Sequence, residues 1–296
     1  MKKYNNKRAV FIFMAPAVIL FTLVVIYPLL KTLLMSFYDW NGLTAIKDTK
    51  FIGLANFKKM FRDDIFYVSL VNGGIYAVVL TGFQLILATF FALTMLDKNI
   101  FGKKFITKVY FIPVVLSITV VCQLWLSMYN PSYGLFNKLF ELLGIPYTQN
   151  WLSSTSKSSI VAIAMVSAWS GMGYQFFLLY TAAKTIPFCY YEAAQIDGAS
   201  KWKTHLKITI PLMQENYKVS LVFCINAGLN AFATNQIMTN GGPGTSTYSL
   251  SFFMYRSAFQ LQKYGYGCAA AVFLVLQCLL VTFILNKVMA RDQITY

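Results

Sequence analysis

Residues 264–286 read YGYGCAAAVFLVLQCLLVTFILN and contain no charged side chain between Lys263 and Lys287. A helix rises about 1.5 Å per residue, so it needs about 20 largely apolar residues to cross roughly 30 Å of hydrocarbon. This stretch passes that test, and five others do as well. The sequence therefore predicts an all-α integral membrane protein with six transmembrane helices. The expected spans are about residues 9–30, 68–96, 107–128, 160–183, 219–238 and 264–286.

The composition agrees with a membrane protein. Of the 296 residues 57% are hydrophobic and only 12% are charged, and the mean hydropathy is +0.57. The formal charge of +15 does not indicate nucleic-acid binding, because the basic residues are scattered over every loop instead of lying on one face. The five cysteines show no metal-ligand spacing, so we expect no metal site. We expect a single membrane domain over residues 1–296.

The N-terminus allows a second interpretation. Lys2, Lys3, Lys7 and Arg8 precede an apolar run, as in a signal peptide. The run is longer than a usual signal sequence and shows no clear small-residue cleavage site, which favours a retained first helix. With the N-terminus inside, 15 of the 25 lysines and arginines lie in cytoplasmic segments. The sequence thus predicts a multi-pass protein with both termini in the cytoplasm.

No catalytic machinery is recognisable. The chain has no G-x-x-x-x-G-K-[ST] phosphate-binding loop, His205 is its single histidine, and the predicted spans hold no acid. We therefore expect a non-enzymatic protein that binds no cofactor of its own.

The cytoplasmic segment of about residues 184–215 contains IPFCYYEAAQIDGASKW at 186–202. Pro187 suits the first position of a helix, and Gly198 suits the left-handed residue that ends one. Ser200 can cap a second helix, which we expect Pro211 to end before the fifth span. The pattern predicts a helical hairpin at the membrane surface.

The spacing of this hairpin resembles the permease subunits of ABC importers, whose signature is E-A-A, three residues, G, nine residues and I-x-L-P. The matching positions are Glu192, Ala193, Ala194, Gly198, Ile208 and Pro211, and Ile210 stands where leucine is usual. The likeness extends to the carbohydrate branch typified by the larger permease of the maltose importer. It is carried by FIGLANF at 51–57, DGAS at 197–200, TNGGP at 239–243 and YGY at 264–266. We expect neither the extra N-terminal spans nor the large outer domain of that permease.

The resemblance implies the fold of a type I ABC importer permease, with a coupling helix that docks on an ATPase. It further implies a prokaryotic cell membrane, a second similar permease, two ATPase subunits that bind ATP and Mg, and an extracellular sugar-binding protein. The expected cargo is a di- or oligosaccharide. The residues expected to couple to the ATPase are Glu192, Ala193, Ala194, Asp197, Gly198 and Ala199.

Aromatic and amide side chains in the fourth and fifth spans suit a hydroxyl-rich ligand, because aromatic faces cover sugar rings while amides bond hydroxyls. The resemblance places Gly171, Tyr174 and Asn230 on the substrate path. Trp169, Gln175 and Asn226 are further candidates, although amides also bond between helices and aromatics also pack.

Two alternatives stay open. The same machinery carries glycerol phosphate in related permeases, but no lysine or arginine lies in the middle of spans four to six. A secondary transporter would need no ATPase, yet its usual intramembrane acid is missing.

Overall fold

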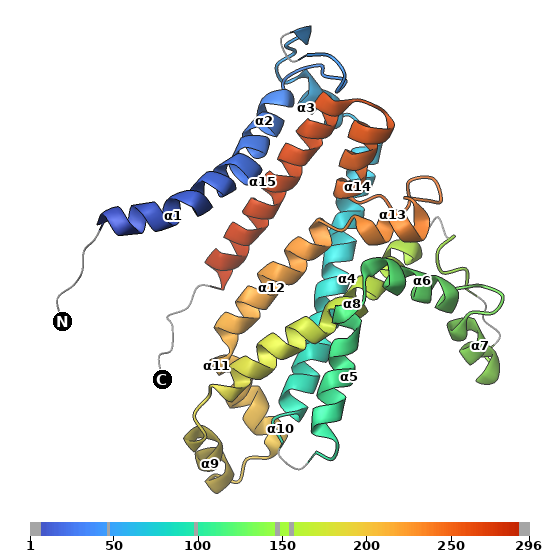
Figure 1. Cartoon of the computed structure of the whole chain (residues 1–296). Coiled ribbons are helices and arrows are strands. Elements are labelled where there is room, and N and C mark those ends of the chain that lie inside the picture. The colour runs from blue at the N-terminus through green and yellow to red at the C-terminus, as the bar shows by residue number, and fades with distance from the viewer. Residues whose placement is uncertain (1–6, 46–47, 98–99, 146–148, 154–156, 290–296) are drawn as a thin grey trace. The chain divides into compact units, whose positions relative to one another are not determined.

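Figure 1 shows the computed structural model, which describes residues 7–45, 48–97, 100–145, 149–153 and 157–289. Within these ranges the regular elements are helices, and the pairing of Tyr38 with Phe51 is an isolated β-bridge. The chain divides into two compact units. One comprises Met1–Asp63 with Phe253–Val275, and the other comprises Asp64–Phe252 with Leu276–Tyr296.

The first unit begins with α1 (Lys7–Phe21), the π-helical turn η1 (Thr22–Ile26) and α2 (Tyr27–Met35), which follow one another without a break. Together they provide an apolar helix over Val10–Met35, where the sequence predicts a span over 9–30. The helix continues past the expected end because Lys31 does not interrupt it. A lysine near a membrane boundary extends its ammonium group to water while its stem stays apolar.

The rest of the first unit is α3 (Ala55–Met60), the end of α14 (Leu250–Tyr255), the π-helical turn η4 (Arg256–Gln260) and the start of α15 (Tyr264–Val288). Buried Asn56 fixes the loop before α3, since its Nδ2 donates to the carbonyls of Ser36 and Tyr38 at 2.9 and 3.0 Å. Gly265 packs so closely on the Tyr38 carbonyl that a Cβ there would lie 2.1 Å from it. These contacts give the YGY and FIGLANF segments a packing role.

The second unit is built around α4 (Asp64–Thr94), α8 (Ser158–Lys184) and α12 (Gln214–Leu229), which pack along one another (Figure 1). The Tyr76 hydroxyl lies 2.5 Å from Ser167 Oγ and 2.7 Å from Thr234 Oγ1, so one buried phenol joins three helices. A Cβ on Gly228 would come within 2.4 Å of the Ala77 backbone, which explains a glycine in α12.

The third predicted span, 107–128, is broken. α5 (Lys103–Val115) and α6 (Ile118–Met128) meet at a bend of 100°. Ser117 has extended backbone angles there and its side chain accepts a hydrogen bond from Val120 N at 3.4 Å, so it caps a new helix. Hydropathy alone does not show such a break.

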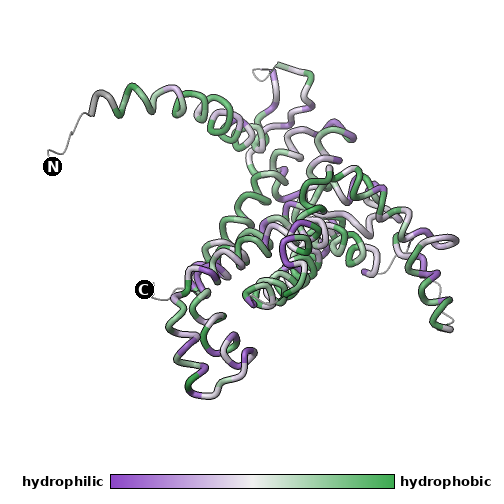
Figure 2. Tube along the Cα trace, turned by 60° about the horizontal axis from the view of Figure 1, so that its bottom comes forward, coloured by the Kyte–Doolittle hydropathy of each residue, from purple (hydrophilic) through white to green (hydrophobic). Residues whose placement is uncertain are grey.

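The fifth predicted span, 219–238, is divided as well. α12 ends at Leu229, and α13 (Ala233–Thr239) starts a separate helix. Counting only the described residues, four helices are long and apolar enough to cross a membrane, or five if the bent pair is one span. Hydrophobic residues dominate the N-terminal helix and much of the long helices in Figure 2.

The T-x-G-G-P segment begins at Thr239, the last residue of α13, and the loop that it opens is held by side chains of the second unit. Asn72 on α4 donates from Nδ2 to the carbonyls of Ser246 and Tyr248 at 2.9 and 3.0 Å. Thr239 Oγ1 and Thr247 Oγ1 lie 2.7 Å apart and close the turn. The short α7 (Leu135–Leu142) follows α6 in this unit.

Candidate substrate path and coupling hairpin

The candidates on α8 fall on two sides of the helix. The Tyr174 side chain is 54% exposed, while Gln175 is buried and its Oε1 has no hydrogen-bond partner among the described residues. Trp169 is half-buried and packs edge-on against Trp125, with ring centroids 5.7 Å apart. Of these three side chains, Tyr174 is therefore the exposed one, whereas the other two are partly or fully buried.

Gly171 faces a neighbouring helix closely. A Cβ at this position would lie 2.3 Å from Nε2 of Gln84, a buried residue of α4. The Gln84 side chain also lies 3.4 Å from the Ser167 carbonyl and accepts from Cys224 Sγ at 3.1 Å. Gln84 thus joins α8 to α12, the two helices that carry the candidates. Sequence reasoning missed it, although an amide in an uncharged span is a usable signal.

The two asparagines lie together at the end of α12. Asn230 Nδ2 donates to the Asn226 carbonyl at 2.9 Å and lies 3.3 Å from Cys278 Sγ. Asn226 Nδ2 donates to Thr282 Oγ1 at 3.0 Å and is half-buried. Asn230 is exposed and stands where α12 stops, so the helix break presents its amide.

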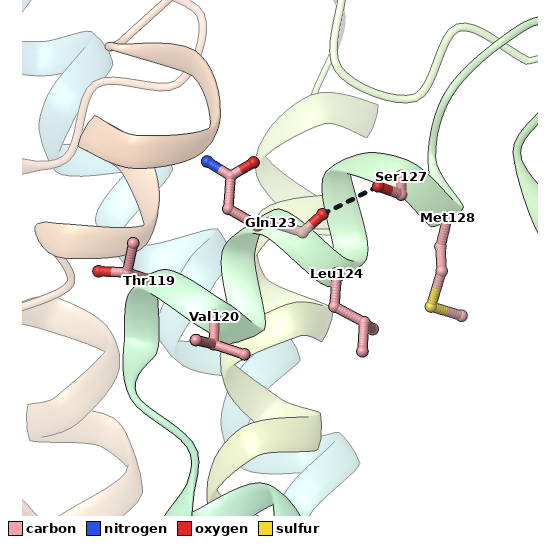
Figure 3. A pocket seen from close by; sticks show the side chains of 6 residues that line it. All are labelled: Thr119, Val120, Gln123, Leu124, Ser127 and Met128. Atoms are coloured by element: carbon pink, nitrogen blue, oxygen red, sulfur yellow. Dashed lines mark hydrogen bonds between the residues drawn. The ribbon is translucent and has the colours of Figure 1, made fainter.

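A shallow hollow of about 590 Å³ runs along α6 and is shown in Figure 3. Three polar residues spaced four apart line one side, and three apolar residues with the same spacing line the other. The lining residues are Thr119, Val120, Gln123, Leu124, Ser127 and Met128. None of the six predicted path residues lines it, so it is an open helix face and not the predicted site.

The segment of residues 184–215 forms the predicted hairpin. Its first helix is α9 (Cys189–Ile196), which ends at Gly198 with φ of +71°. Ser200 caps α10 (Lys201–Thr204) by accepting from Lys203 N at 3.4 Å. Both turn residues are confirmed. Glu192, Ala193 and Asp197 are exposed, Ala194 is buried, and Ala199 is half-buried with its N–H bonded to the Ala194 carbonyl.

The predicted start of the first hairpin helix and the predicted end of the second were both wrong. Pro187 precedes the helix, because Phe188 is the N-cap and α9 starts at Cys189. Pro211 does not end the second helix, which continues through the π-helical turn η3 (His205–Thr209) and α11 (Ile210–Leu212) to a turn at Met213. Pro211 lies in the first turn of α11, where a missing N–H is tolerated.

Side chains tie the hairpin together and attach it to α4. Thr209 Oγ1 lies 3.2 Å from the Tyr191 hydroxyl and 3.1 Å from His205 Nδ1. Lys201 Nζ lies 2.5 Å from Asp97 Oδ2, just after the end of α4, and Trp202 stacks on Phe90 of α4 at 6.0 Å. Burial lowers the pKa of His205, the Lys201 charge lowers it further and Asp97 partly opposes this, so the neutral imidazole is favoured.

The family model described as binding-protein-dependent transport system inner membrane component matches residues 9–294. The chain belongs to this family. It is the membrane permease of an ABC transporter, in which a separate subunit hydrolyses ATP.

Relatives and a solved structure agree over nearly the whole length of this permease. It is 33% identical over 281 residues to a probable ABC transporter permease protein from Pyrococcus horikoshii, covering 95% of each chain. It is 32% identical to the diacetylchitobiose uptake system permease protein of Streptomyces coelicolor, covering 93% of this chain and 81% of that one. A bacterial alginate ABC transporter, crystallised with its alginate pentasaccharide-bound periplasmic protein, has a chain of the same fold. The TM-score is 0.79 at 20% identity, over 99% and 98% of the two chains.

This permease has two kinds of exposed surface. The exposed phenol of Tyr174 and the exposed amide of Asn230 present an aromatic face and neutral hydrogen-bonding groups. The hairpin presents α9, with exposed Glu192 and the exposed Asp197 that follows it, and α9 is bonded to the second helix through Tyr191 and Thr209. The first set suits a neutral polar ligand, and the second suits a protein partner.

Proposed function

We propose that the chain is one permease subunit of an ATP-driven importer for a di- or oligosaccharide. The assignment of a saccharide as the cargo rests on the chemistry of the exposed groups on α8 and at the end of α12. Tyr174 and Asn230 are neutral, and lysine stands only near the helix ends, at Lys184 and Lys218. A sugar needs stacking and hydroxyl bonding, which these groups supply.

The printed activities of the relatives support a saccharide. The Streptomyces coelicolor relative belongs to a diacetylchitobiose uptake system, and the structural neighbour belongs to an alginate transporter. Glycerol phosphate, the alternative cargo, would need a cation on the path to offset the phosphate charge, and the middle parts of α8 and α12 provide none.

The proposed assembly contains this chain, a second similar permease, two ATPase subunits and an extracellular sugar-binding protein. The segments 107–128 and 219–238 are counted as the third and fifth of six spans, each broken within the membrane. Broken spans are familiar in transporters, where the freed helix ends line a cavity. Both termini lie in the cytoplasm, on the side of the lysine-rich hairpin.

The hairpin is proposed as the coupling helix. Its exposed Glu192, Ala193 and Asp197 would contact the ATPase, and its small residues let a partner surface approach closely. Movement of the ATPase subunits would then turn the spans between inward-facing and outward-facing arrangements. In this proposal, these residues link a chain without a phosphate-binding loop to ATP hydrolysis by its partner.

The cargo is tested by a glycan panel. The complete complex, reconstituted with its binding protein, is assayed for ATP hydrolysis with neutral monosaccharides, disaccharides and oligosaccharides and with glycerol phosphate. We expect one group of di- or oligosaccharides to stimulate hydrolysis. Stimulation by glycerol phosphate alone would replace the saccharide assignment.

A further inference from the structure

We propose that Thr209 is a positioning residue that locks the two helices of the hairpin into one rigid body. The inference rests on the proposed coupling function and names the side chains that make it work. Thr209 is fully buried, and its single hydroxyl meets Tyr191 of α9 on one side and His205 on the other.

The hydrogen bonds run through Thr209 in a direction set by the tautomer of His205. A threonine hydroxyl has one proton, so with Nδ1 of neutral His205 as the acceptor Thr209 donates to it and accepts from the Tyr191 hydroxyl. With the proton on Nδ1, Thr209 accepts from His205 and donates to the Tyr191 hydroxyl. The lowered pKa of His205 agrees with that neutral form. The Thr209 hydroxyl is therefore paired with a polar group on each side.

The backbone explains why Thr209 reaches α9. His205 and Thr209 are the first and last residues of η3, so their side-chain contact spans the π-helical turn. A π-helical turn widens the helix locally and redirects the residues that follow it. Pro211 comes two residues later and supplies no N–H, so the wider turn also relieves the helix before the proline.

The contact between Tyr191 and Thr209 lies next to the proposed coupling residues. Tyr191 directly precedes Glu192, the acidic residue of the proposed coupling helix. The start of the second helix is attached to α4 and the residues after it, through Trp202 stacked on Phe90 and Lys201 paired with Asp97. A force applied by the ATPase on α9 would thus pass through Thr209 to the second helix and from there to α4. Without the hydroxyl, α9 would move independently of the helix behind it.

The test uses Thr209→Val, which keeps the shape and removes the hydroxyl, in the complete complex with its binding protein and substrate. The readout is ATP hydrolysed per substrate molecule transported. Thr204→Val is the matched control, because Thr204 is a buried threonine of the same hairpin whose hydroxyl donates to the Ser200 carbonyl of its own helix at 3.1 Å.

We expect Thr209→Val to raise the ATP cost of transport about fivefold or more, in line with the size of ordinary coupling energies. Thr204→Val should leave the ratio unchanged, and Thr209→Ser should restore it. Tyr191→Phe should resemble Thr209→Val, and the double variant should be no worse than either single variant. Equal effects of the two Thr→Val variants, or additive effects of Tyr191→Phe and Thr209→Val, would overturn the proposal.

Failure of the coupling assignment itself would look different. In that case neither Thr209→Val nor a variant that distorts the hairpin turn at Gly198 would change the ratio. An effect at Gly198 without one at Thr209 would leave the coupling role intact and remove only the lock. If Thr209→Val does not accumulate, Tyr191→Phe with the Thr204→Val control provides the same comparison.

Discussion

The side-chain nitrogen of Gln84 occupies the space beside Gly171, 2.3 Å from where a Cβ on that residue would stand. The glycine therefore admits the amide that joins α4, α8 and α12. This contact gives Gly171 a packing reason to be a glycine, alongside its predicted place on the substrate path.

Gly171→Ala should destabilise the protein by about 1–3 kcal/mol, because the new methyl group displaces Gln84 from Ser167 and Cys224. The thermal unfolding midpoint of the detergent-solubilised complex measures this. Adding Gln84→Ala should recover part of the loss by removing the clash. If the double variant is less stable than Gly171→Ala alone, the clash is not the cause.

Tyr174→Ala should lower substrate uptake strongly while assembly and basal ATP hydrolysis stay normal, since more than half of the residue's surface is exposed. Loss of one stacking aromatic corresponds to about 1–2 kcal/mol, or roughly tenfold in affinity. Transport assays on proteoliposomes provide the measurement. Tyr133→Ala, at another exposed tyrosine, is the control, and equal loss in both variants would remove Tyr174 from the path.

Cys189 reports the orientation of the hairpin. It is exposed at the start of α9, whereas Cys122 and Cys224 are buried and the remaining two cysteines are half-buried. A membrane-impermeant maleimide should therefore label the chain in inside-out vesicles and leave right-side-out vesicles unlabelled. Cys189→Ser should abolish the signal. Labelling from the outer side would reverse the proposed topology.

Local chemistry predicted the hairpin well. Gly198 adopts a left-handed conformation and Ser200 caps the next helix, because both effects depend only on the residue and its immediate neighbours. Pro211 was interpreted wrongly, since the π-helical turn before it kept the helix going. A propensity argument does not anticipate such a turn.

The long helices were predictable for a similar reason, because apolar contiguity is visible in the sequence. The predicted span over 160–183 lies within α8, and that over 264–286 lies within α15. The breaks after Val115 and Leu229 were not predictable, since hydropathy is averaged over a window and does not register a change of direction. The contacts of Gln84 were missed because they join three helices that are far apart in sequence.

In the proposed function, the hairpin couples ATP hydrolysis to passage of a substrate. Gly198→Val tests it, because φ of +71° is strained for a β-branched residue while no atom lies within 4 Å of the new Cβ. Gly144→Val imposes the same strain at φ of +69°, also with no atom within 4 Å, two residues after the end of α7. Each substitution should cost about 1–2 kcal/mol locally.

The decisive measurement is substrate-stimulated ATP hydrolysis by the complete reconstituted complex carrying each variant. We expect the complex with Gly198→Val to assemble but lose the stimulation, and the complex with Gly144→Val to retain it. Normal stimulation with Gly198→Val, or equal loss with both variants, would contradict the coupling role of the hairpin.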